Sequence, residues 1–416
     1  MTGEQKQTLA RLIPNARPDK GLIVNRGTLP EELRAFIVPS DSVKLLVAGQ
    51  RGMGKTTELK RLVEMLEADQ EEQFLAVFSQ FGSQDSITDT ALFRHMARAL
   101  AHHEESDVPK GTLEAFENWY AEESLSNTIE EGDEGLAGLG GEFIFFRADA
   151  KIKHAKTSKK TRSQTLVKSK SELLGLFNEL IEKNRKKTRK RVVFIIDDID
   201  KVQNEESIHS TFVQSAQFIS DISCPCIFTI PLSYATSEYV RMALPYTKIH
   251  RVAAVDLLHQ NGTRNDEAFA FMREVFKRRM TFNPLPEELL DQVLLNSGGV
   301  LVDAMRMLGE ICANVVARGA TTAGKSDVDA AFQQLINEFL EVFDNAELWT
   351  KLAKFCEHPD KRVFNIEPAR LDLLSRMILI EYRNQQVWYD LHPAVRQLYE
   401  QNKSVIKESS SQAHAG

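Results

Sequence analysis

The sequence has 416 residues, 42% hydrophobic and 27% charged, a balance typical of globular proteins with two or three domains. Its formal net charge of −7 argues against a protein that coats nucleic acid, although local basic segments could still bind it. Four cysteines are too few for a disulfide framework. We find no apolar signal core and no apolar run of the about 20 residues that span a bilayer, so we expect a cytoplasmic protein without membrane segments.

Strands and helices are predicted to alternate along the first 230 residues. The strands are unbroken apolar runs such as VKLLVA at 43–48, which is typical of strands buried on both faces. The predicted strands are 43–48, 74–81, 192–196 and 226–230, and the predicted helices are 56–68, 87–103, 171–183 and 208–222. This alternation predicts an α/β fold with a parallel sheet that helices cover on both faces.

The segment from about residue 104 to 170 interrupts this alternation. It is first acidic, then glycine-rich at 135–141, and 143–146 is predicted as a strand. The tract 151–170 holds eight lysines or arginines and no acid. We interpret the segment as a partly mobile insertion in the domain that these alternating strands and helices form.

From about residue 265 the pattern becomes helical. Helices are predicted at 266–280, 286–296, 301–318 and 326–343, followed by further helices and a hairpin of 377–382 with 386–391 that resembles the wing of a winged helix. The predicted domains are an N-terminal segment (1–40), an α/β domain (41–262), a helical lid (263–343), a winged helix (344–402) and a disordered tail (403–416).

The run GQRGMGKT at 49–56 fits the pattern GxxxxGK[ST] and lies between a predicted strand and a predicted helix. Its glycines let backbone N–H groups surround phosphates, and the helix N-terminus favours an anion. Lys55 is expected to reach the phosphates, and the Thr56 hydroxyl to bind Mg²⁺. The predicted ATP- or ADP-binding residues of this loop are Gly49, Gln50, Arg51, Gly52, Met53, Gly54, Lys55, Thr56 and Thr57.

Two carboxylates follow the apolar run VVFII at the end of the strand 192–196, which we expect beside the P-loop strand. Ligands bind at the carboxyl ends of strands in such sheets. We predict that Asp197 binds Mg²⁺ and that Asp198 orients or deprotonates the attacking water.

Three further features each have a functional and a structural interpretation. Thr229, at the end of the strand 226–230, could sense the γ-phosphate or be an ordinary β-branched strand residue. Arg241 could reach a phosphate in its own or a neighbouring subunit, or be a solvated helix residue. The basic residues 151–170 and 185–191 could bind nucleic acid or form a solvated surface.

Taken in order, five segments resemble a known group: GQRGMGKTTEL, VVFIIDDIDK, CPCIFTIPLSY, NSGGVLVDAMRML and ILIEYRNQQVWYDLHPAVRQLY. They are similar to bacterial AAA-like P-loop ATPases of the STAND class (signal-transduction ATPases with numerous domains), relatives of origin-licensing ATPases. The resemblance covers residues 43–399 and implies that 41–262 is a P-loop nucleotide-binding domain, followed by a helical lid and a winged helix that closes over bound nucleotide. Such proteins typically rest with ADP and become active on exchange for ATP, often by self-association.

The sequence also departs from that class. Val302 stands where related lids carry an arginine that senses the γ-phosphate, and Arg306 lies one turn further on. His392 follows the run Trp388-Tyr389-Asp390, where relatives have Met-His-Asp with a histidine that touches ADP. His392 either contacts ADP or is a packed histidine before Pro393.

Two functions follow from this reading. The first is a slowly hydrolysing ATPase switch in bacterial signalling or anti-phage defence, which forms a homo-oligomer with ATP and acts through a separate effector protein. The alternative is a DNA-binding AAA-type ATPase of the loader or transposition-regulator kind.

Overall fold

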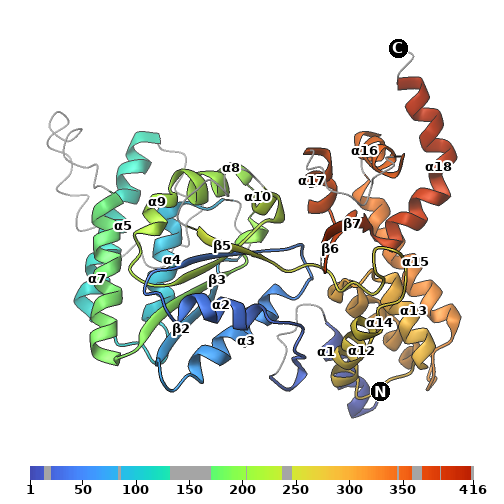
Figure 1. Ribbon diagram of the computed structural model, residues 1–416, viewed down its shortest axis with the longest axis horizontal. Coiled ribbons are helices and arrows are strands. Elements are labelled where there is room, and N and C mark those ends of the chain that lie inside the picture. Colours follow the sequence, from blue (N-terminus) through green and yellow to red (C-terminus); the bar gives the residue numbers. More distant parts are fainter. Residues whose placement is uncertain are drawn as a thin grey trace.

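The computed structural model describes residues 1–13, 20–82, 86–131, 170–202, 204–236, 246–343, 346–357, 368–384 and 386–413. The chain forms two lobes that lie side by side (Figure 1). One lobe holds a sheet with helices on both faces, and the other holds the helices and hairpin of the C-terminal part.

The first lobe is built on a five-stranded parallel sheet in the order β2-β3-β4-β1-β5. Its strands are β1 (Lys44–Ala48), β2 (Phe74–Gln80), β3 (Arg191–Asp197), β4 (Cys226–Ile230) and β5 (Tyr246–Arg251). The predicted α/β fold with a parallel sheet is confirmed. The prediction that the acidic strand lies beside the P-loop strand is wrong, because β4 pairs with both β1 and β3 and separates them.

Alternate residues of the buried strands pack against different helical layers. Leu45 and Val47 of β1 share one apolar cluster with α2 (Leu29–Ile37) and α3 (Lys55–Glu67). Leu46 and Ala48 share the other cluster, with the helices of the opposite face. Those helices are α4 (Asp89–Ala101), α5 (Lys110–Glu131), α7 (Lys170–Thr188), α8 (Glu205–His209), the π-helical turn η4 (Ser210–Gln214) and α9 (Ala216–Ser220).

Helix α5 replaces the first part of the expected insertion. Its Phe116 and Trp119 are fully buried, and the Phe116 ring lies 6.2 Å from that of Phe177 on α7. Residues 110–131 therefore belong to the helical layer of the sheet (Figure 1). The predicted strand 143–146 and the basic tract up to residue 169 lie outside the described residues.

The four helices predicted for the lid form within two residues of their expected bounds. They are α12 (Asp266–Arg279), α13 (Glu287–Asn296), α14 (Leu301–Ala317) and α15 (Lys325–Val342). Helix α1 (Gly3–Leu12) joins them: Leu12 is buried in the shared core, and the Thr8 hydroxyl accepts a 2.9 Å hydrogen bond from the Phe282 backbone. The N-terminal segment thus contacts both lobes, because α1 lies on the lid and α2 on the sheet.

The C-terminal part contains α16 (Ala346–Glu357), α17 (Pro368–Ser375), the antiparallel pair β6 (Leu379–Arg383) and β7 (Val387–Leu391), and α18 (Pro393–Ala413). The predicted hairpin is therefore present. The disordered tail expected from residue 403 is wrong up to Ala413, because α18 continues from a first part anchored by buried Ala394, Val395 and Leu398. Among the described residues no helix is both long and apolar enough to cross a bilayer.

Candidate nucleotide-binding site

The P-loop connects β1 to α3 at the carboxyl edge of the sheet. Gly52 and Gly54 have φ angles of 76° and 91°, a left-handed conformation that glycine adopts without steric cost. The carbonyl of Gly54 then accepts the first helical hydrogen bonds, from the backbones of Thr57 and Glu58. The loop therefore has the strand–turn–helix context in which successive N–H groups and a helix N-terminus favour phosphate.

Lys55 is held inside this loop in the described structure. Its ammonium group donates to the carbonyls of Gly49 at 2.8 Å and Gln50 at 2.9 Å. It also lies 3.0 Å from a carboxylate oxygen of Asp200. The ammonium thus has an acceptor in the protein for each of its three protons. Lys55 must give up at least one of these contacts to bind a phosphate.

Thr56 and Asp197, the two predicted Mg²⁺ ligands, meet directly. The Thr56 hydroxyl donates to Asp197 Oδ2 at 2.6 Å, and the other oxygen, Oδ1, is buried without a hydrogen-bond partner among the described residues. Burial raises the pKa of the Asp197 carboxyl, and the hydrogen bond from Thr56 partly offsets that effect. The Thr56 hydroxyl and the Asp197 carboxylate, which has one buried unpaired oxygen, form a donor set that suits Mg²⁺, since this ion prefers oxygen ligands. When bound, the ion would neutralise charge on the phosphates.

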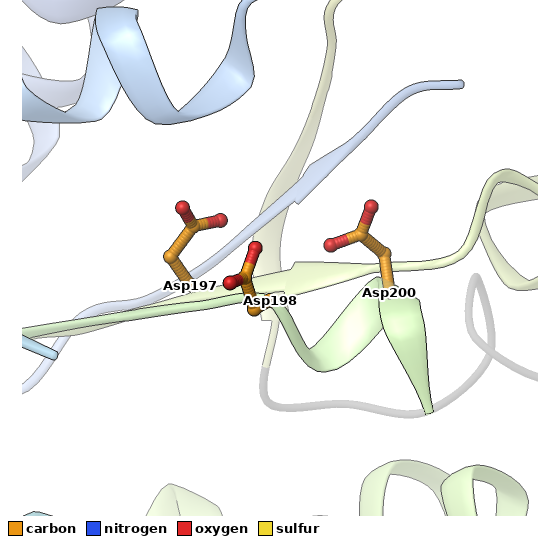
Figure 2. A group of neighbouring side chains, drawn as sticks. All are labelled: Asp197, Asp198 and Asp200. Carbon is orange, nitrogen blue, oxygen red and sulfur yellow. The ribbon is translucent and has the colours of Figure 1, made fainter. Parts of the chain in front are cut away.

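Asp198 begins the short turn η3 (Ile199–Lys201) with a left-handed φ of 69°. Its carboxylate accepts a 3.0 Å hydrogen bond from Gln80, at the end of β2, and forms a 2.8 Å ion pair with Lys201. Gln80 was not predicted, because only the parallel pairing of β2 with β3 brings it opposite Asp197. These two partners fix the predicted catalytic carboxylate at the sheet edge, next to Asp197 (Figure 2).

Thr229 lies next to this acidic turn. It is fully buried, and its hydroxyl accepts a 3.2 Å hydrogen bond from the backbone of Ile199. It therefore supports the turn that carries Asp198 and Asp200. Its predicted role as a γ-phosphate sensor stays a prediction.

The lid lies directly on the P-loop. A methyl group added at Gly52 would come within 2.2 Å of Val302 Cγ1, and one at Gly54 within 3.3 Å of Leu301. Val302, at the position expected to hold an arginine, thus presents only methyl groups to the P-loop. Arg306 forms ion pairs with Asp303 at 3.6 Å and Glu338 at 3.5 Å, both on lid helices.

The remaining loop residues and His392 have different surroundings. Arg51 is exposed, Met53 is buried and Thr57 is half-buried. His392 is buried between the lid helices, with its ring 4.5 Å from that of Phe339 and its Nε2 3.3 Å from Asp303. These contacts match the packed interpretation of His392, and contact with ADP stays a prediction. Arg241 lies outside the described residues.

Arg26 is a site residue that the sequence did not reveal. Its guanidinium donates to the carbonyls of Met53, in the P-loop, and Ala253, after β5. An isolated arginine in an N-terminal segment carries no motif, so only the fold could place it at the P-loop.

One family model matches part of the chain. Residues 30–216, which hold the P-loop and the acidic turn, match the KAP family P-loop domain. No curated protein matches the chain. The chain therefore contains a P-loop NTPase domain, and the predicted STAND class is not confirmed.

Several solved structures are similar over most of the chain. The ORC2 protein of Aeropyrum pernix in its ADP form is 11% identical with a TM-score of 0.49, covering 96% of this chain and 98% of that one. The Walker-type ATPase PABY2304 of Pyrococcus abyssi is 13% identical with a TM-score of 0.49, covering 93% and 99%. Cdc6p of Pyrobaculum aerophilum is 13% identical with a TM-score of 0.43, covering 94% and 99%.

Proposed function

We propose that the chain binds ATP with Mg²⁺ and hydrolyses it slowly, as a STAND-type switch in bacterial signalling or anti-phage defence that acts through a separate effector. The nucleotide-binding part of this proposal rests on one observation. Thr56, the residue after Lys55, donates a 2.6 Å hydrogen bond directly to Asp197. A phosphate-binding loop, a metal-binding hydroxyl and an acidic strand end are the parts that phosphoryl transfer to water requires.

Slow turnover is supported by the contact between the lid and the P-loop. Val302 lies against Gly52, where a longer cationic side chain would be close to bound phosphates. An arginine that stabilises the transition state contributes about 10³–10⁵ to the rate in P-loop NTPases. We therefore expect a basal rate of about 10⁻² s⁻¹ or slower.

Hydrolysis measurements on three proteins test this proposal. Asp198→Asn keeps the volume of the side chain but removes its basicity, and we expect it to lower kcat by about 10²–10⁴-fold while ATP still binds. Lys55→Ala should weaken nucleotide binding itself. Rapid turnover by the purified wild type, on the order of 1 s⁻¹ without any partner, would contradict the slow switch.

The second candidate, a DNA-binding AAA-type ATPase, is favoured by the basic end of α7. There the side chains of Arg185, Lys186 and Lys187 are 45%, 73% and 47% exposed. This surface lies at the opposite end of α7 from the predicted basic tract, which ends at Lys170, and phosphate binding by such residues is strongly salt-dependent.

A DNA-binding titration at several salt concentrations distinguishes the two candidates. The DNA-binding candidate predicts ATP-dependent binding whose logarithmic salt slope falls by about one for each phosphate contact removed, as in Lys186→Gln. The same prediction applies to Lys159, Lys160 and Arg162 of the tract. An unchanged slope in these variants, or no binding by the wild type, would leave the switch as the better proposal.

A further inference from the structure

Asp200 is a buried carboxylate at the nucleotide site that belongs to neither predicted metal-binding position. Turn η3 places it two residues after Asp198, with its side chain 5% exposed. Its Oδ2 lies 3.0 Å from the Lys55 ammonium, whereas its Oδ1 has no hydrogen-bond partner among the described residues. A buried oxygen without a donor is costly, so its presence here calls for a ligand that is not part of the chain.

A second carboxylate of the same acidic group, that of Asp197, also has a buried unpaired oxygen among the described residues. Asp197 is 1% exposed, and its Oδ1 likewise lacks a hydrogen-bond partner among the described residues. One carboxylate oxygen from each of Asp197, Asp198 and Asp200 lies within 4.8 Å of the others, and the three side chains leave the sheet edge on the same side (Figure 2). Two carboxylates that approach each other this closely, each with one buried and unpaired oxygen, match the demands of a hard divalent cation.

Asp198 is less available for such a cation than its neighbours. Its two oxygens already accept from Lys201 at 2.8 Å and from Gln80 at 3.0 Å. Asp197 and Asp200 each keep one oxygen free of protein donors within the described part of the chain. The two carboxylates with an oxygen available to a cation are therefore Asp197 and Asp200.

The position of Lys55 gives Asp200 two successive partners. While Lys55 contacts Asp200, that carboxylate is neutralised in its buried position. Once the ammonium contacts a phosphate, Asp200 would be left buried without a positive partner, which is strongly unfavourable. A cation beside the phosphates removes this cost.

We propose that Asp200 is an additional carboxylate of the divalent-cation site, held by Lys55 in the nucleotide-free protein and released to the cation, directly or through water, when a nucleotide engages Lys55. This inference rests on the proposed nucleotide site and adds a residue to it. It also makes Lys55 and Asp200 a linked pair, so that nucleotide binding strengthens cation binding.

The Mg²⁺ dependence of nucleotide binding tests this proposal without measuring catalysis. Fluorescence of a labelled, non-hydrolysable ATP analogue gives its affinity in EDTA and over a series of Mg²⁺ concentrations. In Asp200→Asn we expect the half-saturating Mg²⁺ concentration to rise on the order of 10-fold or more, as for other groups around metal sites. Affinity in EDTA should stay unchanged or increase, because Lys55 loses a competing acceptor.

The matched control is Asp89→Asn. Asp89 is also a buried aspartate paired with a lysine, Lys170, at 2.5 Å, and it accepts from Ser215. This variant should keep the Mg²⁺ dependence of the wild type. Asp200→Glu, which retains a carboxylate, should recover part of the lost Mg²⁺ affinity.

Two results would overturn the proposal. One is an unchanged Mg²⁺ half-saturation in Asp200→Asn, and the other is an equal loss of nucleotide affinity with and without Mg²⁺, which would make Asp200 a residue that only shapes the loop. If Asp200→Asn does not fold, Asp200→Ser is judged by the same two results. A wild type without Mg²⁺-dependent nucleotide binding would refute the proposed function itself, a different outcome from a failure of Asp200 alone.

Discussion

Gly52 is the residue at which the P-loop and the lid constrain each other most tightly. Its φ is 76°, and Val302 Cγ1 lies 2.2 Å from the place where a side-chain carbon would be. A longer side chain is therefore excluded by the backbone conformation and by the neighbouring helix together.

Gly52→Ala should lower the free energy of unfolding by about 2–5 kcal/mol, since a left-handed conformation costs a non-glycine residue about 1–2 kcal/mol and overpacking costs about 1–3 kcal/mol. Urea unfolding measures this change. Gly175→Ala is the control, because Gly175 lies inside α7 and a methyl group added there would meet no atom within 4 Å. That control should be neutral or stabilising, and a Gly52→Ala protein of equal stability would contradict the tight contact.

His250 gives the fold a specific dependence on pH. It is buried on β5, and burial lowers its pKa from 6.5 to about 4. Because the unfolded chain binds this proton at a higher pH than the folded chain, stability is full above about pH 6.5 and is lost as the pH falls toward 4.

Between pH 7.5 and pH 5 this one group should remove about 2 kcal/mol from the free energy of unfolding. His250→Gln should abolish that part of the loss in urea unfolding curves at the two pH values. Parallel pH dependence in the wild type and the variant would show that His250 is not the group responsible.

At the level of residues, the sequence was informative where a motif fixes the spacing. Lys55 and Thr56 are adjacent in a known pattern, and Asp197 ends an apolar run, so their approach could be predicted. The roles of Gln80, Arg26 and Asp200 depend on β2 pairing with β3, on the path of the N-terminal segment, and on the turn η3. No local spacing encodes these three relations.

At the level of elements, the hairpin β6–β7 is attached to the P-loop through one side chain. Gln50 is 6% exposed, and its amide group donates to the carbonyls of Leu374 at 2.8 Å and Leu379 at 2.6 Å. Its oxygen accepts from the backbone of Glu381 at 2.9 Å. The P-loop and the hairpin therefore share a buried hydrogen-bond network.

Gln50→Ala should destabilise the protein by about 2–4 kcal/mol, because it removes the partners of the buried Leu379 carbonyl and the Glu381 N–H group. The Leu374 carbonyl keeps a hydrogen bond from the Met377 backbone. Hydrogen exchange should be faster in β6 than in the wild type, while β2 and β3 stay protected. Unchanged protection of β6 would mean that the hairpin is held independently of the P-loop.

Element boundaries were predictable where periodicity was strong. The lid helices repeat apolar residues at helical spacing, and strands β2, β3 and β4 are apolar runs. The predicted bounds of these elements agree closely with the structure. Strand β5 was missed, because it lies at a sheet edge and its sequence YTKIHR has no apolar run, with Tyr246 and Ile249 as its only apolar residues. The order of β1, β3 and β4 depends on long-range pairing that no single segment carries.

At the scale of the whole molecule, the two lobes meet at the P-loop, the candidate nucleotide site. The P-loop contacts α14 through Gly52, β6 through Gln50 and the N-terminal segment through Arg26. A ligand that displaces any of these contacts changes the relation between the lobes, so nucleotide binding has a direct physical route to the lid and the hairpin.

If ATP drives self-association, as the resemblance to the STAND class implies, the particle mass should depend on the nucleotide. Light scattering should give a monomer mass near 47.1 kDa with ADP and a multiple of it with a non-hydrolysable ATP analogue. Lys55→Ala should keep the monomer mass in both conditions. An identical mass for the wild type with both nucleotides would contradict self-association but not nucleotide binding.

Binding of a triphosphate to this protein is expected to need both the Lys55 ammonium and a divalent cation held by the carboxylates. Isothermal titration calorimetry of the wild type with a non-hydrolysable ATP analogue, in Mg²⁺ and in EDTA, tests it most directly, with Lys55→Ala titrated alongside. We predict saturable binding in Mg²⁺ that weakens at least about 10-fold in EDTA and is lost in Lys55→Ala. Absence of binding by the folded wild type, or equal binding by Lys55→Ala, would contradict the account.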